Sequence, residues 1–258
     1  MTTGHAHALY VHGKSPVHRL PPECKVAALL VFVIAVVATP PRAVWAFGLY
    51  AAIAAAVLAV SGVPRRVVAR RAVVEIPFLL FAVMLPFLGP PPDVAVGPME
   101  LSTVGLWAAW SIVAKGTLGV LASIALTATT EVTDILEGLD RLRVPRVFTD
   151  IAGFMVRYLD VILGEQRRMR VAMLSRGYDP RWWWQARALA ASAGSLFIRS
   201  YERGERVFFA MTARGYQGHM PRFAREEAGA RSWVLALALP TLAAAVALAT
   251  ATWLETPR

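Results

Sequence analysis

The sequence has little charge, one cysteine and no nucleotide-binding loop, and each shortage argues against a class of protein. Charged residues make up 17% of the 258 residues, whereas a soluble domain carries about 25%. Cys24 is the single cysteine, so an internal disulfide framework is excluded. The phosphate-binding pattern Gly-x-x-x-x-Gly-Lys-[Ser/Thr] does not occur, so the chain is not an ATPase of that type. The sequence also offers no metal-ligand cluster and no nucleophile–base pattern in its apolar segments.

The N-terminal segment, residues 1–25, lacks the apolar stretch that a secretory signal peptide needs. We therefore expect it to stay in the cytoplasm. It carries His5, His7, His12 and His18. Imidazole suits cobalt or nickel, so these histidines either contact a divalent metal or belong to a mobile tail that carries them incidentally.

Apolar runs, in contrast, are abundant. Hydrophobic residues make up 57% of the chain and the mean hydropathy is +0.51. A run of about 20 apolar residues can cross a bilayer. The first run has only 14 residues and reaches that length by extension through Glu23 and Lys25, whose side chains would snorkel to the headgroups. The five expected spans are Val26–Thr39, Ala43–Val60, Ala72–Leu88, Thr103–Thr130 and Ser232–Leu254.

Positive charge is distributed unevenly between the segments that join these spans. All but three of the 27 Lys and Arg residues lie in 1–25, 61–71 and 131–231. A presumed loop at 61–71 carries four arginines, whereas the Pro- and Gly-rich loop at 89–102 carries none. The positive-inside rule places the first three segments in the cytoplasm and 89–102 outside. The rule also accounts for the net charge of +10 without a nucleic-acid partner.

Two ionisable residues lie within the runs. Glu75 is either an interfacial or paired group or a proton carrier. Lys115 should face protein or water, as a paired structural lysine or in a transport role, because a charge in lipid is costly. Gly116 and Gly119 permit close helix approach. We predict four spans in 26–130, a cytoplasmic domain in 131–231 and a last span in 232–254.

Two long amphipathic helices are expected within the cytoplasmic domain. Pro145 suits the first position of a helix, which needs no N–H partner, and this helix should run to about Arg176. A second helix is expected at about Arg187–Arg214. The apolar face of the first helix, recognised by its helical spacing, comprises Ile151, Phe154, Met155, Tyr158, Leu159, Ile162, Met169 and Met173.

Each of these helices ends in a heptapeptide, and the two copies share five residues. Residues 172–178 read A-M-L-S-R-G-Y and residues 210–216 read A-M-T-A-R-G-Y. The glycines, Gly177 and Gly215, suit the left-handed position after a helix. Arg176 and Arg214 then lie in the last turn, with Ala172 and Ala210 one turn earlier on the same face. The repeat indicates a favourable helix ending, an internal structural repeat, or two equivalent contacts on a two-fold partner.

With these motifs the chain resembles the transmembrane T component of energy-coupling factor (ECF) transporters, the EcfT/CbiQ family. The marks are Ala172…Arg176-Gly177 and Ala210…Arg214-Gly215. S-P-V-H-R-L-P-P-E-C-K before the first span, L-R-V-P, R-Y-L-D and E-Q-R-R-M-R-V-A-M add to the resemblance, which runs from about Ser15 to the last span.

The resemblance implies an all-α, polytopic membrane protein with about five transmembrane helices and a cytoplasmic domain of long amphipathic coupling helices. It implies a non-enzymatic scaffold without cofactor or metal, in the cell membrane, whose helices dock on two ABC-type ATPase subunits and pass their motion to a substrate-binding membrane subunit. Arg176, Gly177, Arg214 and Gly215 would be the ATPase-coupling residues. Ala172 and Ala210 would be helix-packing positions.

The substrate is open at this stage. The N-terminal H-A-L-Y…S-P-V-H-R-L-P-P pattern is most similar to the cobalt-type CbiQ proteins, whereas a nickel or vitamin importer is the alternative within the family. A self-sufficient metal permease would need ion ligands at mid-membrane, and an intramembrane enzyme would need a catalytic pair.

Overall fold

The computed structural model describes residues 10–13, 15–90, 93–96, 99–179, 186–218 and 228–255. It divides into two compact units. The membrane unit comprises Leu9–Leu142 and Glu227–Arg258, and the second unit comprises Met1–Ala8 and Arg143–Glu226. The structural division falls after residue 142, one helix later than the boundary expected after residue 130.

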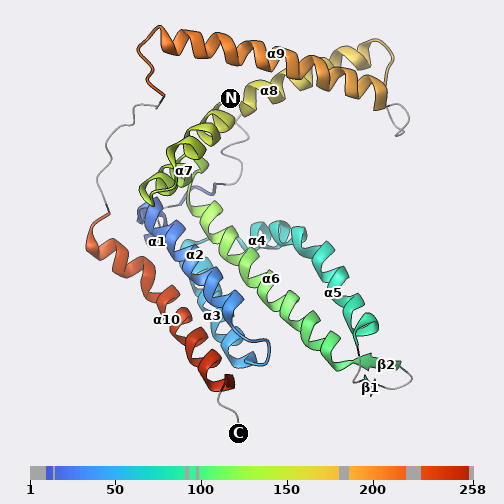
Figure 1. Cartoon of the computed structure of the whole chain (residues 1–258), viewed down its shortest axis with the longest axis vertical. Helices are drawn as coiled ribbons and strands as arrows, with labels where there is room; N and C mark the ends of the chain where they lie inside the picture. The colour runs from blue at the N-terminus through green and yellow to red at the C-terminus, as the bar shows by residue number, and fades with distance from the viewer. Residues whose placement is uncertain are drawn as a thin grey trace. The chain divides into compact units, whose positions relative to one another are not determined.

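The membrane unit is built almost entirely of helices (Figure 1). They are α1 (Pro16–Arg19), α2 (Pro22–Ala38), α3 (Val44–Ser61), α4 (Arg65–Ala72), the 3-10 turn η2 (Val73–Glu75), α5 (Ile76–Leu88), α6 (Thr103–Thr129), α7 (Val132–Arg141) and α10 (Ala230–Glu255). The all-α class is thereby confirmed.

Four helical segments of the described chain are long and apolar enough to cross a membrane: Val44–Ser61, Arg65–Leu88, Thr103–Thr129 and Ala230–Thr252. The fifth expected span corresponds to α2, which has 17 residues. This length is at the lower limit for crossing a bilayer. Helix α2 packs against α10, α6 and α7.

Two connecting segments differ from the expected loops. The arginines of 61–71 lie on α4, because the chain resumes a helix at Arg65, directly after Pro64; the prediction of a loop there was wrong. The segment 89–102, which was expected to be an external loop, contains an antiparallel hairpin of β1 (Asp93–Val96) and β2 (Met99–Ser102). Its last residue, Ser102, caps α6 by accepting a hydrogen bond from the backbone N–H of Gly105 at 3.2 Å.

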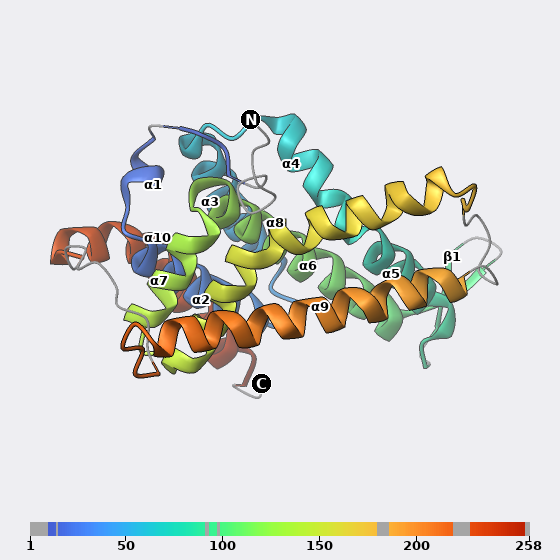
Figure 2. The ribbon, with the colours of Figure 1, turned by 90° about the horizontal axis from the view of Figure 1, so that it is seen from above.

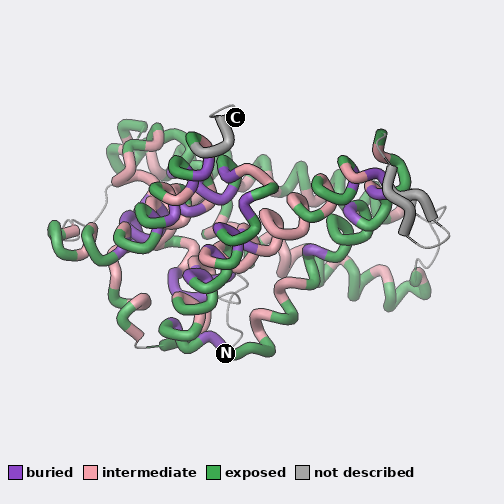
Figure 3. The backbone as a smooth tube through the Cα atoms, turned by 90° about the horizontal axis from the view of Figure 1, so that it is seen from below, coloured by how far each residue is buried: buried purple, intermediate pink, exposed green. Residues whose placement is uncertain are grey.

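The core of the membrane unit lies between α2, α3, α6 and α10. Figure 3 colours the buried residues purple. Tyr50 on α3 is fully buried there. Its hydroxyl donates to the carbonyl of Ala243 on α10 at 3.2 Å and lies 2.9 Å from the Thr39 hydroxyl. Phe32 and Phe47 meet the Tyr50 ring edge-on. The buried hydroxyls are therefore satisfied, as burial of polar groups requires.

The side chains of Glu23 and Lys25, at the start of α2, were predicted to reach the lipid headgroups. They are instead buried in protein. The ammonium group of Lys25 donates to the carbonyls of His18 and Thr129 at 3.2 and 3.0 Å, and to the Thr130 hydroxyl at 3.1 Å. Glu23 pairs with Arg141 at 2.9 Å. The prediction failed because the last turns of α6 and α7 cover this end of α2.

Both ionisable residues within the runs have protein partners. Glu75 is buried and accepts a hydrogen bond from the Thr117 hydroxyl at 2.6 Å. A side chain at Gly116 would meet the Glu75 carboxylate at 3.1 Å, so this glycine makes room for it. Lys115 donates to the carbonyl of Val37, in the last turn of α2, at 2.7 Å. The expectation that Lys115 faces protein or water is confirmed.

The Glu23–Arg141 pair supports a stability prediction. Replacing Arg141 by Gln leaves the Glu23 carboxylate, whose side chain is 4% exposed, without its guanidinium. Breaking a buried pair costs several kcal/mol, and the partial exposure of Arg141 reduces this, so we expect a loss of about 2 kcal/mol. Thermal unfolding of the purified protein in detergent measures it.

The control is Arg206→Gln, which removes an exposed ion pair with Glu202 and should cost less than about 0.5 kcal/mol. The double change Glu23→Gln/Arg141→Gln should regain most of the loss. Equal melting of Arg141→Gln and Arg206→Gln would contradict a stabilising role for the buried pair.

Candidate functional site: two helix tips

The second unit consists of two long helices, α8 (Arg146–Ser175) and α9 (Ala186–Thr212). Helix α8 begins after Pro145, and both helices end within two residues of the predicted ends. They run in opposite directions (Figure 2). Two contacts define this antiparallel arrangement. Met169, near the end of α8, contacts Ser195, near the start of α9. Phe154, near the start of α8, lines a groove together with Met211, near the end of α9.

The carboxylate of Glu165 on α8 joins the two helices. Glu165 accepts hydrogen bonds from Arg168 at 3.1 Å and from Arg199 on α9 at 2.8 Å, and Arg203 lies 3.6 Å away. The hydrogen bonds from Arg199 and Arg168 lower the pKa of Glu165. The Glu165 carboxylate therefore stays ionised to a lower pH than an ordinary carboxyl group does. The ionised carboxylate stabilises the folded helix pair above the ordinary carboxyl pKa. This stabilisation is lost as the pH falls through the lowered pKa of Glu165.

Contacts to methionine sulfur also join α8 and α9. The Ser192 and Ser195 hydroxyls lie 3.9 and 3.5 Å from the Met169 sulfur. A groove of about 330 Å³ separates the helices further along. Part of the predicted apolar face of α8 lines this groove. Phe154, Tyr158 and Ile162 line it together with Met155, of which 68% is nevertheless exposed.

The two heptapeptides form the same helix ending. Gly177 and Gly215 have φ of +74° and +84°, in the left-handed region that glycine adopts without steric cost. The N–H of Tyr178 donates to Met173 at 3.0 Å and that of Gly177 to Leu174 at 3.0 Å. This pair of bonds is a Schellman motif. The prediction of a left-handed glycine after each helix is confirmed.

The second copy repeats these bonds with the same lengths. Tyr216 donates to Met211 at 3.0 Å and Gly215 to Thr212 at 3.0 Å. In both copies, Met and Tyr occupy the two positions whose side chains usually touch across a Schellman motif. The four side chains are half-buried: Met173, Tyr178, Met211 and Tyr216. Met and Tyr therefore belong to the turn itself.

The other shared residues point outward in both copies. Ala172, Arg176, Ala210 and Arg214 are exposed. Each tip thus presents a guanidinium, with its planar fork of donors, one turn beyond a small residue. Because the helices are antiparallel and α9 has 27 residues, the tips lie at opposite ends of the pair, roughly 40 Å apart at 1.5 Å per residue.

Of the N-terminal histidines, His12 and His18 lie within the described residues. His5 and His7 lie outside the described residues. Both ring nitrogens of His18 face protein oxygens, Nδ1 the Ser15 hydroxyl at 2.7 Å and Nε2 the Val11 carbonyl at 3.0 Å. His18 is therefore a structural residue. Among the residues that the structure describes, no group of three or more His, Cys, Asp and Glu side chains is placed to hold a metal ion.

The chain is similar to known membrane transport proteins. The chain matches the family model described as cobalt transport protein CbiQ over residues 13–223. A cobalt transport protein CbiQ of Rhodobacter capsulatus is 31% identical over 59% of this chain and 63% of its own length. An energy-coupling factor transporter transmembrane protein EcfT of Heliobacterium modesticaldum is 28% identical over 81% of this chain and 83% of its own length.

A putative fused cobalt transport protein CbiMQ of Methanocorpusculum labreanum is 31% identical over 47% of this chain. That match spans 20% of the fused protein's length.

Alanine substitution should change helix stability in opposite directions at two glycines, one at a helix end and one within a helix. Gly177→Ala places a Cβ at a positive φ and should destabilise the end of α8 by about 1 kcal/mol. Gly194, within α9, has open space around it and an ordinary helical conformation. Gly194→Ala should therefore stabilise α9 by about 0.5–1 kcal/mol.

Amide hydrogen exchange measures both effects. The Tyr178 amide, which the Schellman motif protects, should exchange faster in Gly177→Ala, whereas amides around residue 194 should exchange more slowly in Gly194→Ala. A slower Tyr178 amide in Gly177→Ala would contradict the assigned turn.

Proposed function

The chain belongs to the CbiQ family of membrane transport components, and from this premise we propose that it is the coupling subunit of an ATP-driven ECF importer. In this proposal α8 and α9 dock on two ABC-type ATPase subunits. The membrane unit holds a separate substrate-binding membrane subunit. The chain itself is not an enzyme, in keeping with relatives named as transport components.

The observation that carries the proposal is the repetition of one helix tip at two ends of one helix pair. A pair of ATPase subunits related by a two-fold axis offers two equivalent acidic sites, and two equivalent tips match them one to one. A guanidinium forms two parallel hydrogen bonds with a carboxylate. The proposed contacts are Arg176 and Arg214, held in place by Gly177 and Gly215, with Ala172 and Ala210 allowing close approach of the partner.

Charge supports the orientation that this docking needs. Arg65, Arg66, Arg70 and Arg71 gather on α4, whereas the segment that forms the hairpin, 89–102, has no Lys or Arg. The positive-inside rule then supports a cytoplasmic position for the N-terminus, α4 and the α8–α9 pair, where the ATPases and their ATP are. The importer as a whole resides in the cell membrane.

Cobalt is the proposed substrate, since the family description and the Rhodobacter capsulatus relative carry cobalt transport in their names. Nickel and a vitamin are the alternatives. The metal itself is cargo of the substrate-binding subunit, and this chain takes no cofactor or metal of its own.

Charge reversal at the tips tests the docking. Arg176→Glu and Arg214→Glu should each weaken binding to the ATPase pair about 30-fold or more, because each leaves a carboxylate facing carboxylates. The double change should abolish co-purification of the ATPases. Arg206→Glu is the matched control, since this arginine is also exposed on α9 but lies two turns before the tip.

Membrane insertion and thermal unfolding of the variants should match those of the unaltered chain. Undiminished co-purification of both ATPases with the double variant would overturn the docking role of the tips. Uptake of radiolabelled cobalt by cells that express the complete importer tests the substrate. Uptake of nickel or a vitamin in place of cobalt would replace cobalt in the proposal while leaving the docking intact.

A further inference from the structure

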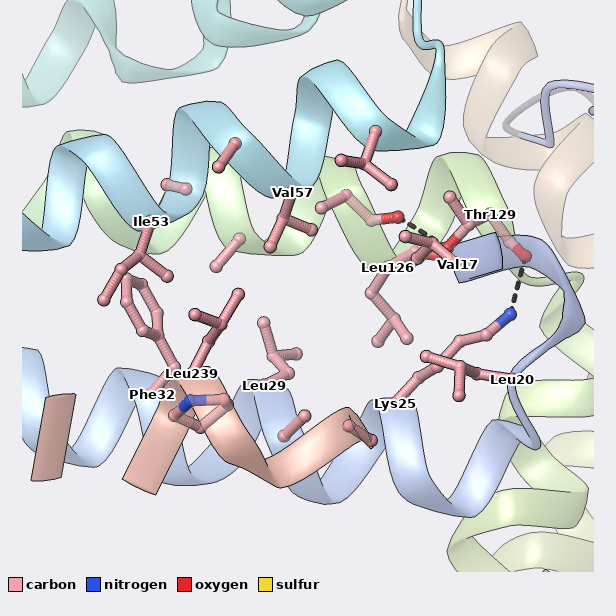
Figure 4. Close-up of a pocket in the computed structure, with 18 of the residues that line it drawn as sticks. Val17, Leu20, Lys25, Leu29, Phe32, Ile53, Val57, Leu126, Thr129 and Leu239 are labelled. Atoms are coloured by element: carbon pink, nitrogen blue, oxygen red, sulfur yellow. Dashed lines mark hydrogen bonds between the residues drawn. The ribbon is translucent and has the colours of Figure 1, made fainter. Parts of the chain in front are cut away.

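An apolar cavity of about 250 Å³ lies among α2, α3, α6 and α10 in the membrane unit. Figure 4 shows Val17, Leu20, Lys25 and Thr129 at one end, and Phe32 at the other. Almost all of its lining is hydrocarbon side chain. The cavity is separate from the helix tips, and its content is independent of the proposed function.

The cavity follows from the way α3 and α10 meet. The two helices are joined by the hydrogen bond from Tyr50 to the Ala243 carbonyl. Toward the end where α10 begins, Val60 on α3 and Leu235 on α10 line the cavity and are 54% and 62% exposed. The cavity is therefore open between these two helices, on the apolar surface that spanning helices turn toward lipid.

The chemistry of the lining restricts what can fill the cavity. Water requires polar partners, and an apolar cavity of this size stays dry. Leaving it empty forfeits the dispersion contacts of its lining. Lys25 offers no donor, because its three N–H groups are directed at His18, Thr129 and Thr130. A hydrocarbon chain satisfies these conditions, and in a bilayer acyl chains surround the opening.

Two arginines adjoin lining residues of the cavity in the sequence, and they favour a charged headgroup nearby. Arg19 directly precedes Leu20 of the lining, and Arg231 lies one turn before Leu235. Both side chains are exposed. Within the ranges that the structure describes, neither guanidinium forms an ion pair. Basic groups beside a pocket between spanning helices favour anionic lipid headgroups.

We propose that this cavity binds one acyl chain of an anionic phospholipid, whose phosphate lies against Arg19 and Arg231. The acyl chain fills the space between α3 and α10 as far as Phe32, and the two arginines select the charge of the headgroup. Retention of one such lipid through purification is the expected consequence.

Native mass spectrometry of the full chain tests this assignment. The protein is freed of lipid in detergent and titrated with dioleoylphosphatidylglycerol or dioleoylphosphatidylcholine. Ala56 lines the cavity from an exposed position on α3, and its neighbour Ala55 is also exposed but does not line it. Ala56→Phe should abolish the high-affinity lipid adduct, whereas Ala55→Phe should retain it. Equal thermal unfolding of the two variants shows that both fold.

The double variant Arg19→Gln/Arg231→Gln tests the headgroup contact. It should weaken phosphatidylglycerol binding about 30-fold, from two lost cationic contacts, and leave phosphatidylcholine binding unchanged. Equal lipid retention by Ala56→Phe and Ala55→Phe would overturn the site. Equal affinity of the unaltered chain for the two lipids would overturn the anionic preference. Loss of a partner membrane subunit in Ala56→Phe, without loss of lipid, would assign the cavity to a partner helix.

Discussion

The last turn of every helix leaves backbone carbonyls without an intrahelical partner, and meeting this requirement shapes both units of the molecule. In the membrane unit two lysines supply the missing donors. Lys115 donates to Val37 at the end of α2, and Lys25 donates to Thr129 at the end of α6. In the second unit glycine does this work, because the left-handed turns at Gly177 and Gly215 bring backbone N–H groups back to the helix.

This shared requirement explains why residues that look functional in the sequence have structural roles. A lysine among apolar residues suggests an ion pathway, yet Lys115 on α6 donates to a free carbonyl in the last turn of the neighbouring helix α2. The Arg-Gly tips differ because their turn is completed by the backbone alone. The guanidiniums of Arg176 and Arg214 are not needed to close it, and so they are available for a partner.

Local signals in the sequence predicted the second unit well. Pro145, Gly177 and Gly215 act on their own backbone, so the ends of α8 and α9 follow from neighbouring residues. The class of the membrane unit and the approximate spans followed from apolar runs. Of the candidate site, the turn geometry was predictable, whereas the roles of Arg176 and Arg214 depend on partners and remain predictions.

Long-range contacts decided the cases that the sequence could not predict. Glu23 meets Arg141, 118 residues away, and periodicity carries no information on such a pairing. Snorkelling was a reasonable expectation for a charged residue at the end of an apolar run, and it failed because α7 covers that end. The hairpin at β1 and β2 was likewise hidden by the Pro and Gly residues around it, which favour turns without specifying strands.

The way Glu165 joins α8 to α9 has a mechanical consequence. Its carboxylate faces both Arg199 and Arg203, which lie one turn apart on the same side of α9, so either arginine can keep the ion pair when the angle between the helices changes. The neighbouring Met169 sulfur contacts are polarisable and adapt readily to altered geometry. A tightly interlocked apolar seam would resist such a tilt. Contacts of this kind tolerate a small change in the angle between α8 and α9 better than close apolar packing does.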